Sequence, residues 1–168
     1  VLLVPAELAL ALVLALFVNR GIKGRNFFRA IYFMPFVLSL AAIGLVWTWL
    51  LSDFGVMAKA LNFFGLRQPR WLTEPSLAMP ALVITSVWRN AGYYMVIFLA
   101  GIQNIPKELY EASRIDGAGR WQQFLRITWP MLTPTTFLAI IVGVILGFQV
   151  FDLAYIMTQG GPIYSTYT

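Results

Sequence analysis

The sequence predicts an all-α fold, a polytopic membrane helix bundle with four spans and one helix–turn–helix loop. Of the 168 residues, 60% are hydrophobic and 11% are charged, whereas a soluble domain is about 45–50% apolar and about 25% charged. Apolar stretches of membrane length recur at 1–18, 29–51, 77–103 and 131–151. The one long polar interlude with helical spacing lies at 104–130. We therefore expect a single transmembrane domain over 1–168, as an internal piece of a longer protein.

The first span, 1–18, is apolar apart from Pro5 and Glu7, and we expect Glu7 to reach the membrane interface. A stretch of this length at about 1.5 Å per residue nearly crosses a hydrocarbon core of about 30 Å. A short basic loop without acidic residues follows, and lysine and arginine accumulate in cytoplasmic loops. The chain should therefore begin outside the cytoplasm, with the polar loop at 104–130 inside.

The second span, 29–51, should be kinked at Pro35, because proline removes a helical hydrogen bond. Trp47 and Trp49 near its far end are typical of the aromatic belt at a membrane interface. The outer connection at 52–76 mixes charged and apolar residues, and a short interfacial helix is expected there.

The third span, 77–103, carries Arg89 near its middle. An arginine at that depth costs about 2.5–3.5 kcal/mol on insertion scales, so it must face protein, water or a partner chain. Two interpretations stay open with equal weight, a role in a transport pathway and a buried structural ion pair.

The fourth span, 131–151, has Pro134 in its first turn. Gly143 and Gly147 have the small-xxx-small spacing that lets helices approach closely, which predicts a packing role. Polar groups gather near its outer end, at Gln149, Asp152 and Tyr155.

The polar loop at 104–130 predicts two helices and a turn. Pro106 suits a first turn, and a helix should run from there to about Ile115. Gly117 can take a left-handed conformation and end that helix. A second helix should run from about Gly119 to Thr128 and stop before Pro130. Leu109, Ala112 and Ile115 share one face, as do Phe124 and Ile127, which predicts an apolar seam between the arms.

Several chemistries are disfavoured by composition. The chain has no cysteine, so disulfides and thiolate metal sites are excluded, and no histidine, the commonest general base. No Walker-type glycine loop is present for ATP hydrolysis. The net charge of +5 indicates membrane topology and lipid headgroup contact rather than nucleic-acid binding. We therefore expect no catalytic residue, no metal site and no nucleic-acid partner.

The loop carries a family resemblance. Its pattern of Glu111-Ala112-Ser113, then Gly117, Ile127 and Pro130 resembles the EAA loop of permease subunits of ATP-binding-cassette (ABC) importers. Two departures are mild: Ser113 stands where a second alanine is usual, and Trp129 where leucine is usual. The resemblance implies that the loop couples to an ATPase through Glu111, Ala112, Ser113, Asp116, Gly117, Phe124, Ile127 and Pro130.

The rest of the chain resembles sugar-type permeases of the maltose and glycerol-phosphate kind, which implies a type I importer fold that lacks an N-terminal and at least one C-terminal helix here. The matching residues are Asn19-Arg20, Gly24-Arg25, Phe27 to Ala30, Pro35, Trp71-Leu72, Trp88, Leu99 to Gly101, Ile105-Pro106, Thr158 and Gly160 to Pro162. The resemblance implies a substrate pathway near Ser86, Arg89, Asn90, Tyr93 and Gln149. Arg89 and Asn90 depart from the maltose-type pattern.

The function that the resemblance implies is import of sugars, related polyols or oligosaccharides, driven by a separate ATPase. This chain would bind no cofactor, and ATP and Mg²⁺ would sit on the partner. The implied partners are a cytoplasmic ABC ATPase dimer, a second permease subunit in a heterodimer, an extracytoplasmic solute-binding protein and the lipid of a bacterial or archaeal cell membrane, which the chain would cross several times.

Two other functions stay open from the residues. The chain could be an ATP-independent secondary transporter or channel subunit, with Arg89 and Asp152 as its membrane charges. It could also be a scaffold whose loop docks a soluble partner.

Overall fold

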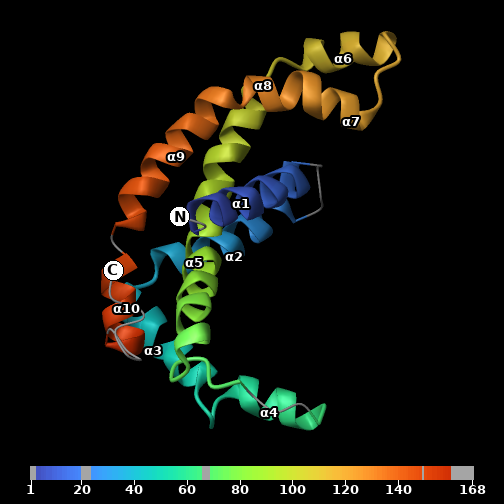
Figure 1. Ribbon diagram of the computed structural model, residues 1–168. Coiled ribbons are helices and arrows are strands. Elements are labelled where there is room, and N and C mark those ends of the chain that lie inside the picture. Colours follow the sequence, from blue (N-terminus) through green and yellow to red (C-terminus); the bar gives the residue numbers. More distant parts are fainter. Residues whose placement is uncertain (1–2, 20–23, 66–68, 149, 160–168) are drawn as a thin grey trace. The chain divides into compact units, whose positions relative to one another are not determined.

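The computed structural model describes residues 3–19, 24–65, 69–148 and 150–159. Within these ranges all the regular elements are helices, as predicted (Figure 1). In chain order they are α1 Leu3–Asn19, α2 Arg25–Val37, α3 Leu40–Leu51, α4 Val56–Phe63, α5 Pro75–Gln103, α6 Lys107–Ile115, α7 Arg120–Gln123, the π-helix η1 Phe124–Thr128, α8 Trp129–Met131, α9 Thr133–Gly147 and α10 Val150–Thr158.

The helices form two compact units. The first unit comprises Val1–Phe33 and Ala91–Val144, and the second comprises Met34–Asn90 and Ile145–Thr168. The polar loop therefore belongs to the first unit, together with α1 and the last part of α5.

Small side chains allow close packing in the first unit. Ala11 and Ala15 of α1 have no exposed surface. A Cβ added at Gly143 of α9 would lie 2.8 Å from Val4 Cγ1 and 3.3 Å from the Tyr94 hydroxyl. The packing role predicted for Gly143 is therefore confirmed, and this is the kind of contact that holds helices together where lipid removes the hydrophobic driving force between them. Glu7 is 1% exposed, so the expectation that it reaches the interface is wrong: its place on α1 turns it into this packed core.

The second unit has an apolar cluster formed by α3, α5 and α10. Its buried members are Leu51, Ala81, Leu82, Leu153, Ala154 and Met157. Trp47 packs against this cluster and also edge-to-face on Trp88, with 5.6 Å between ring centroids. Of the two tryptophans predicted for an interfacial belt, Trp49 is the exposed one.

The helix limits differ from the expected spans at two places. The second span is broken at Leu38–Ser39, one turn after Pro35, which lies inside α2. The predicted kink at Pro35 itself stays a prediction. Ser39 has an extended backbone and its carbonyl accepts a hydrogen bond from Ile43 N–H, so a new helix, α3, begins there. The fourth span is divided between α9 and α10. The short helix expected in the outer connection is present as α4.

By length and composition, two described helical stretches could cross a membrane, Leu40–Phe63 and Pro75–Gln103. A third is formed if Arg120–Met131 and Thr133–Gly147, which meet at 61°, count as one span. With its 17 residues, α1 is a shorter apolar helix. The predicted count of four spans stays a prediction.

Candidate functional site

The polar loop folds as a helical hairpin, residues 106–131, in which α6 and the α7–η1–α8 arm run side by side (Figure 1). Pro106 is the N-cap of α6, and Glu108 lies in the first turn, where its charge complements the helix dipole. Arg114 lies in the last turn, which the dipole also favours. The sequence of α6 therefore favours helix at both of its ends.

The turn of the hairpin depends on Gly117, which has a φ of +78°. Its N–H donates to Arg114 O at 3.0 Å, and Ala118 N–H donates to Ser113 O at 2.8 Å. This pair of bonds is the Schellman motif that ends helices with a left-handed glycine. The predicted turn is confirmed, with Asp116 as the exposed C-cap of α6.

Four polar side chains, Tyr110, Ser113, Gln123 and Thr128, join the two arms, and we call them the polar clamp. The Gln123 amide donates to Ser113 Oγ at 2.9 Å and to the Tyr110 carbonyl at 3.3 Å. The Tyr110 and Thr128 hydroxyl groups share a hydrogen bond of 2.9 Å. Gln123 and Thr128 are 8% and 5% exposed, so these bonds satisfy polar groups that would be costly to bury alone.

The predicted apolar seam between the arms is wrong. Leu109 and Ile115 are 41% and 87% exposed, and Ala112 is exposed too. The reason is rotational: Tyr110 and Ser113 face the second arm, which turns the apolar residues of α6 away from it. The hairpin therefore presents an apolar face beside Glu111, which is also exposed.

The second arm also runs further than predicted, through Pro130 to Met131 in α8. The π-helix η1 explains this: Trp129 N–H donates to Phe124 O, five residues back, so the ladder before the proline is already widened. The same five-residue turn places Thr128 Oγ1 3.5 Å from Gln123 O. The π-turn thus continues the arm past Pro130, which is exposed, and brings two clamp residues to one side.

The aromatic residues of the second arm pack on one another. Phe124 stacks on Trp121 with ring centroids 5.6 Å apart and an interplanar angle of 24°. Phe124 and Ile127 are both half-buried. Of the predicted coupling residues, Ser113 takes part in the hydrogen bonds between the arms, and the prediction missed Tyr110, Gln123 and Thr128.

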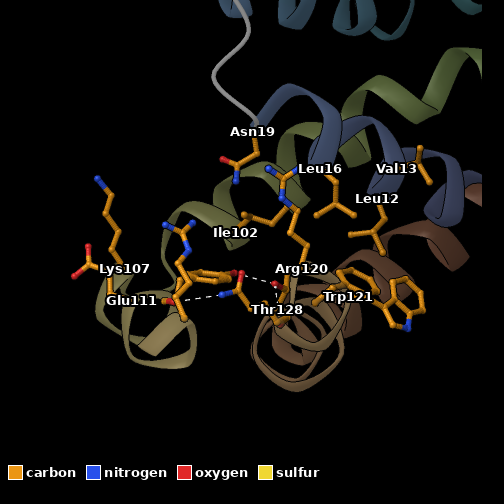
Figure 2. A pocket seen from close by; sticks show the side chains of 14 residues that line it. Leu12, Val13, Leu16, Asn19, Ile102, Lys107, Glu111, Arg120, Trp121 and Thr128 are labelled. Atoms are coloured by element: carbon orange, nitrogen blue, oxygen red, sulfur yellow. Dashed lines mark hydrogen bonds between the residues drawn. The ribbon is translucent and has the colours of Figure 1, made fainter. Parts of the chain in front are cut away.

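A groove of about 1110 Å³ lies between the hairpin and α1, all within the first unit. Figure 2 shows Leu12 and Leu16 of α1 facing it from one side and Trp121 and Thr128 of the hairpin from the other. Four charged residues also line it, Lys107, Glu111, Arg114 and Arg120.

The residues predicted for a substrate pathway lie on α5, apart from Gln149, which is outside the described residues. Ser86 and Asn90 are buried, at 3% and 6% exposure. The Arg89 guanidinium lies 5.2 Å from the centroid of the Phe36 ring, and its Nη1 donates to Asn90 Oδ1 at 3.1 Å. Tyr93 is half-buried and meets Tyr94 edge-to-face. The spacing of Ser86, Arg89, Asn90 and Tyr93 places them on one helix face, and none of the four is among the residues that line the groove beside the hairpin.

Comparisons with known proteins agree over nearly the whole chain. The profile of the family described as "binding-protein-dependent transport system inner membrane component" matches residues 7–168. A probable ABC transporter permease protein of Pyrococcus horikoshii is 37% identical over 99% of this chain and 58% of its own length. The trehalose/maltose transport system permease protein MalF of Thermococcus litoralis is 36% identical over 95% of this chain and 54% of its own length.

A solved structure is similar as well. The crystal structure of a bacterial alginate ABC transporter, in complex with an alginate pentasaccharide-bound periplasmic protein, matches with a TM-score of 0.81 and 25% identity. The match covers 95% of this chain and 56% of that one. This chain therefore spans little more than half the length of the proteins it resembles.

Proposed function

The chain belongs to the family of binding-protein-dependent transport system inner membrane components, and from that premise we propose that it is the permease subunit of an ATP-driven importer of sugars, related polyols or oligosaccharides. The relatives named for trehalose/maltose and for sulfoquinovosyl glycerol transport, the second from Agrobacterium fabrum, support this substrate class. The family match speaks against the ATP-independent transporter and the scaffold.

The hairpin would be the surface of the permease that binds a cytoplasmic ABC ATPase dimer. The observation that carries this proposal is the exposed apolar face of α6, where Ile115 is 87% exposed beside the exposed carboxylate of Glu111. Burying a side chain of that size in a partner is worth about 1.5–3 kcal/mol. Glu111 would pair with a basic group on the ATPase, which adds a charge-assisted bond to the apolar contact.

The polar clamp would make the hairpin a stiff lever. Closure of the ATPase can bias the permease only if displacement of α6 reaches the membrane helices instead of being absorbed within the loop. The three hydrogen bonds between the arms would oppose bending within the loop, so that displacement of α6 also moves the second arm. Gly117 permits the turn, and the second arm continues through Pro130 toward α9.

The chain itself would carry no cofactor, since ATP and Mg²⁺ would bind the ATPase. A second permease subunit, in a heterodimer, and an extracytoplasmic solute-binding protein would complete the importer; the similar alginate transporter, solved with a periplasmic protein, supports the latter. The membrane would be that of a bacterial or archaeal cell, with the hairpin in the cytoplasm.

Co-purification of the ATPase with the full-length permease tests this proposal. Ile115→Glu should remove most of the bound ATPase and ATP-dependent uptake while leaving the protein in the membrane. Leu125→Glu is the matched control, because Leu125 is exposed in the same hairpin but lies on the second arm. Normal ATPase recovery with Ile115→Glu, or equal losses in both variants, would contradict the proposal.

A further inference from the structure

The groove between α1 and the hairpin combines an apolar wall with a cationic lining. Leu12, Val13 and Leu16 of α1 line it, and Val13 is 62% exposed. Trp121 and Phe124 extend the apolar lining on the hairpin side. A groove of about 1110 Å³ lies near the upper end of the roughly 300–1,000 Å³ range of ligand pockets, so it has room for a large ligand.

Cations outnumber acids in this groove. Among the described residues that line it, Lys107, Arg114 and Arg120 stand against one carboxylate, that of Glu111. Figure 2 shows Arg120 extending from α7 toward the α1 side of the groove, near Leu16 and Asn19. Arginine pairs well with phosphate because its planar guanidinium donates two parallel hydrogen bonds. The ligand should therefore carry both a phosphate and a long apolar part.

We propose that this groove binds an anionic phospholipid of the cytoplasmic leaflet, with the headgroup phosphate on Arg114 and Arg120 and an acyl chain along α1. The inference rests on the proposed function only for the placement of the hairpin at the cytoplasmic membrane surface. Basic pockets beside membrane helices on that side are suited to anionic headgroups. A soluble ATPase is the weaker occupant, because one wall of the groove belongs to an apolar helix that forms part of the membrane domain.

A bound lipid would connect the lever to the bilayer. Arg114 directly precedes Ile115 on α6, and Glu111 lies one helical turn before Ile115. Because Ile115 does not line the groove, a headgroup on Arg114 would hold α6 from the α1 side while Ile115 stays available to the ATPase. This arrangement would keep the hairpin at a fixed depth as it moves.

Trp121 offers a direct probe, because it lines the groove and bromine atoms on lipid chains quench tryptophan fluorescence on contact. The full-length permease would be placed in lipid nanodiscs that contain either dibromo-phosphatidylglycerol or dibromo-phosphatidylcholine. The Trp121 contribution is the difference between the wild type and Trp121→Phe. We expect stronger quenching by phosphatidylglycerol. The relative affinity for phosphatidylglycerol over phosphatidylcholine, taken from titrations of the two brominated lipids, should fall about 5-fold for each arginine removed in Arg114→Gln and Arg120→Gln.

Arg126→Gln is the matched control, because Arg126 is exposed in the same hairpin and does not line the groove. Its preference for phosphatidylglycerol should equal that of the wild type. Arg120→Gln also keeps the test valid if Arg114→Gln unfolds the turn, since a cation at the N-terminal end of α7 opposes the helix dipole and its loss does not weaken the helix.

Equal quenching of Trp121 by the two lipids, or an unchanged preference in the double variant, would overturn the proposal. The proposal would also be overturned if Trp121 were protected from quenching only when ATPase is added, to the same extent with either lipid. That result would assign the groove to the ATPase. Because the assay needs no ATPase, a permease that prefers phosphatidylglycerol yet captures no ATPase would refute only the proposed function.

Discussion

At the scale of the residue, Ser113 explains how a departure from the family pattern is accommodated. Its hydroxyl donates to Tyr110 O at 2.9 Å and accepts from the Gln123 amide at the same distance. An alanine there would offer neither interaction, so the contact between Ser113 and Gln123 depends on the serine hydroxyl. The resemblance pointed to Ser113, but its partner is ten residues away and required the fold.

Replacing Gln123 with leucine should loosen the hairpin. The change removes both bonds of a buried amide and leaves Ser113 Oγ without its donor, which costs about 1–3 kcal/mol. Amide hydrogen exchange across 107–131 in the full-length permease should therefore become faster, and ATP-driven uptake should fall. Gln103→Leu is the control, since Gln103 is exposed at the end of α5; similar exchange in both variants would count against the clamp.

Gly117 and Gly119 allow the effect of backbone conformation on the turn to be distinguished from the effect of steric room for a side chain. Neither Gly117 nor Gly119 has any atom within 4 Å of an added Cβ, but only Gly117 has a positive φ, +78° against −71° at Gly119. Gly117→Ala should destabilise the hairpin by about 1–2 kcal/mol. Gly119 is the N-cap of α7, where alanine is a poorer cap than glycine, and this loss offsets the smaller backbone entropy of alanine in the unfolded chain. Gly119→Ala should therefore change the stability of the hairpin by less than about 1 kcal/mol. Exchange rates of the α6 amides measure both effects, and equal rates in the two variants would be incompatible with the turn described.

At the scale of the element, the π-turn η1 was beyond the reach of sequence reasoning. The turn predicted at Gly117 is confirmed by its positive φ. The helix end predicted before Pro130 is wrong, because α8 continues through the proline. Helical periodicity assumes 3.6 residues per turn, so it separates Gln123 from Thr128, which the five-residue turn brings together. The apolar seam failed for a related reason: polar contacts between the arms set the rotation of α6.

The bond between Tyr110 and Thr128 ties α6 to the end of η1 and can be measured by a double-mutant cycle. Tyr110→Phe removes the hydroxyl of the tyrosine, Thr128→Val removes that of the threonine, and the combined variant removes both. We expect a coupling free energy of about 0.5–1.5 kcal/mol in the opening of the α6 amides. Additive effects of the two substitutions would mean that the bond contributes nothing to the stiffness of the hairpin.

At the scale of the whole molecule, the sequence was sufficient for the class and the family. Composition and apolar periodicity predicted an all-α membrane bundle, and the spacing from Glu111 to Pro130 indicated the permease family that the comparisons support. Packing of Glu7 and the break at Ser39 depend on tertiary contacts, which a local pattern does not contain. Arg89 shows the same limit: the sequence predicted a position near the middle of the third span, but not its position over Phe36.

The proposed function requires the hairpin to contact a cytoplasmic ATPase through the exposed face of α6. Photo-cross-linking from a benzoylphenylalanine at position 115 of the full-length permease, in membranes with its importer partners, tests this most directly. We predict a cross-link to the ATPase that changes in yield between ATP-bound and nucleotide-free states. Cross-links only to lipid or to extracytoplasmic proteins, with the ATPase present, would contradict the account.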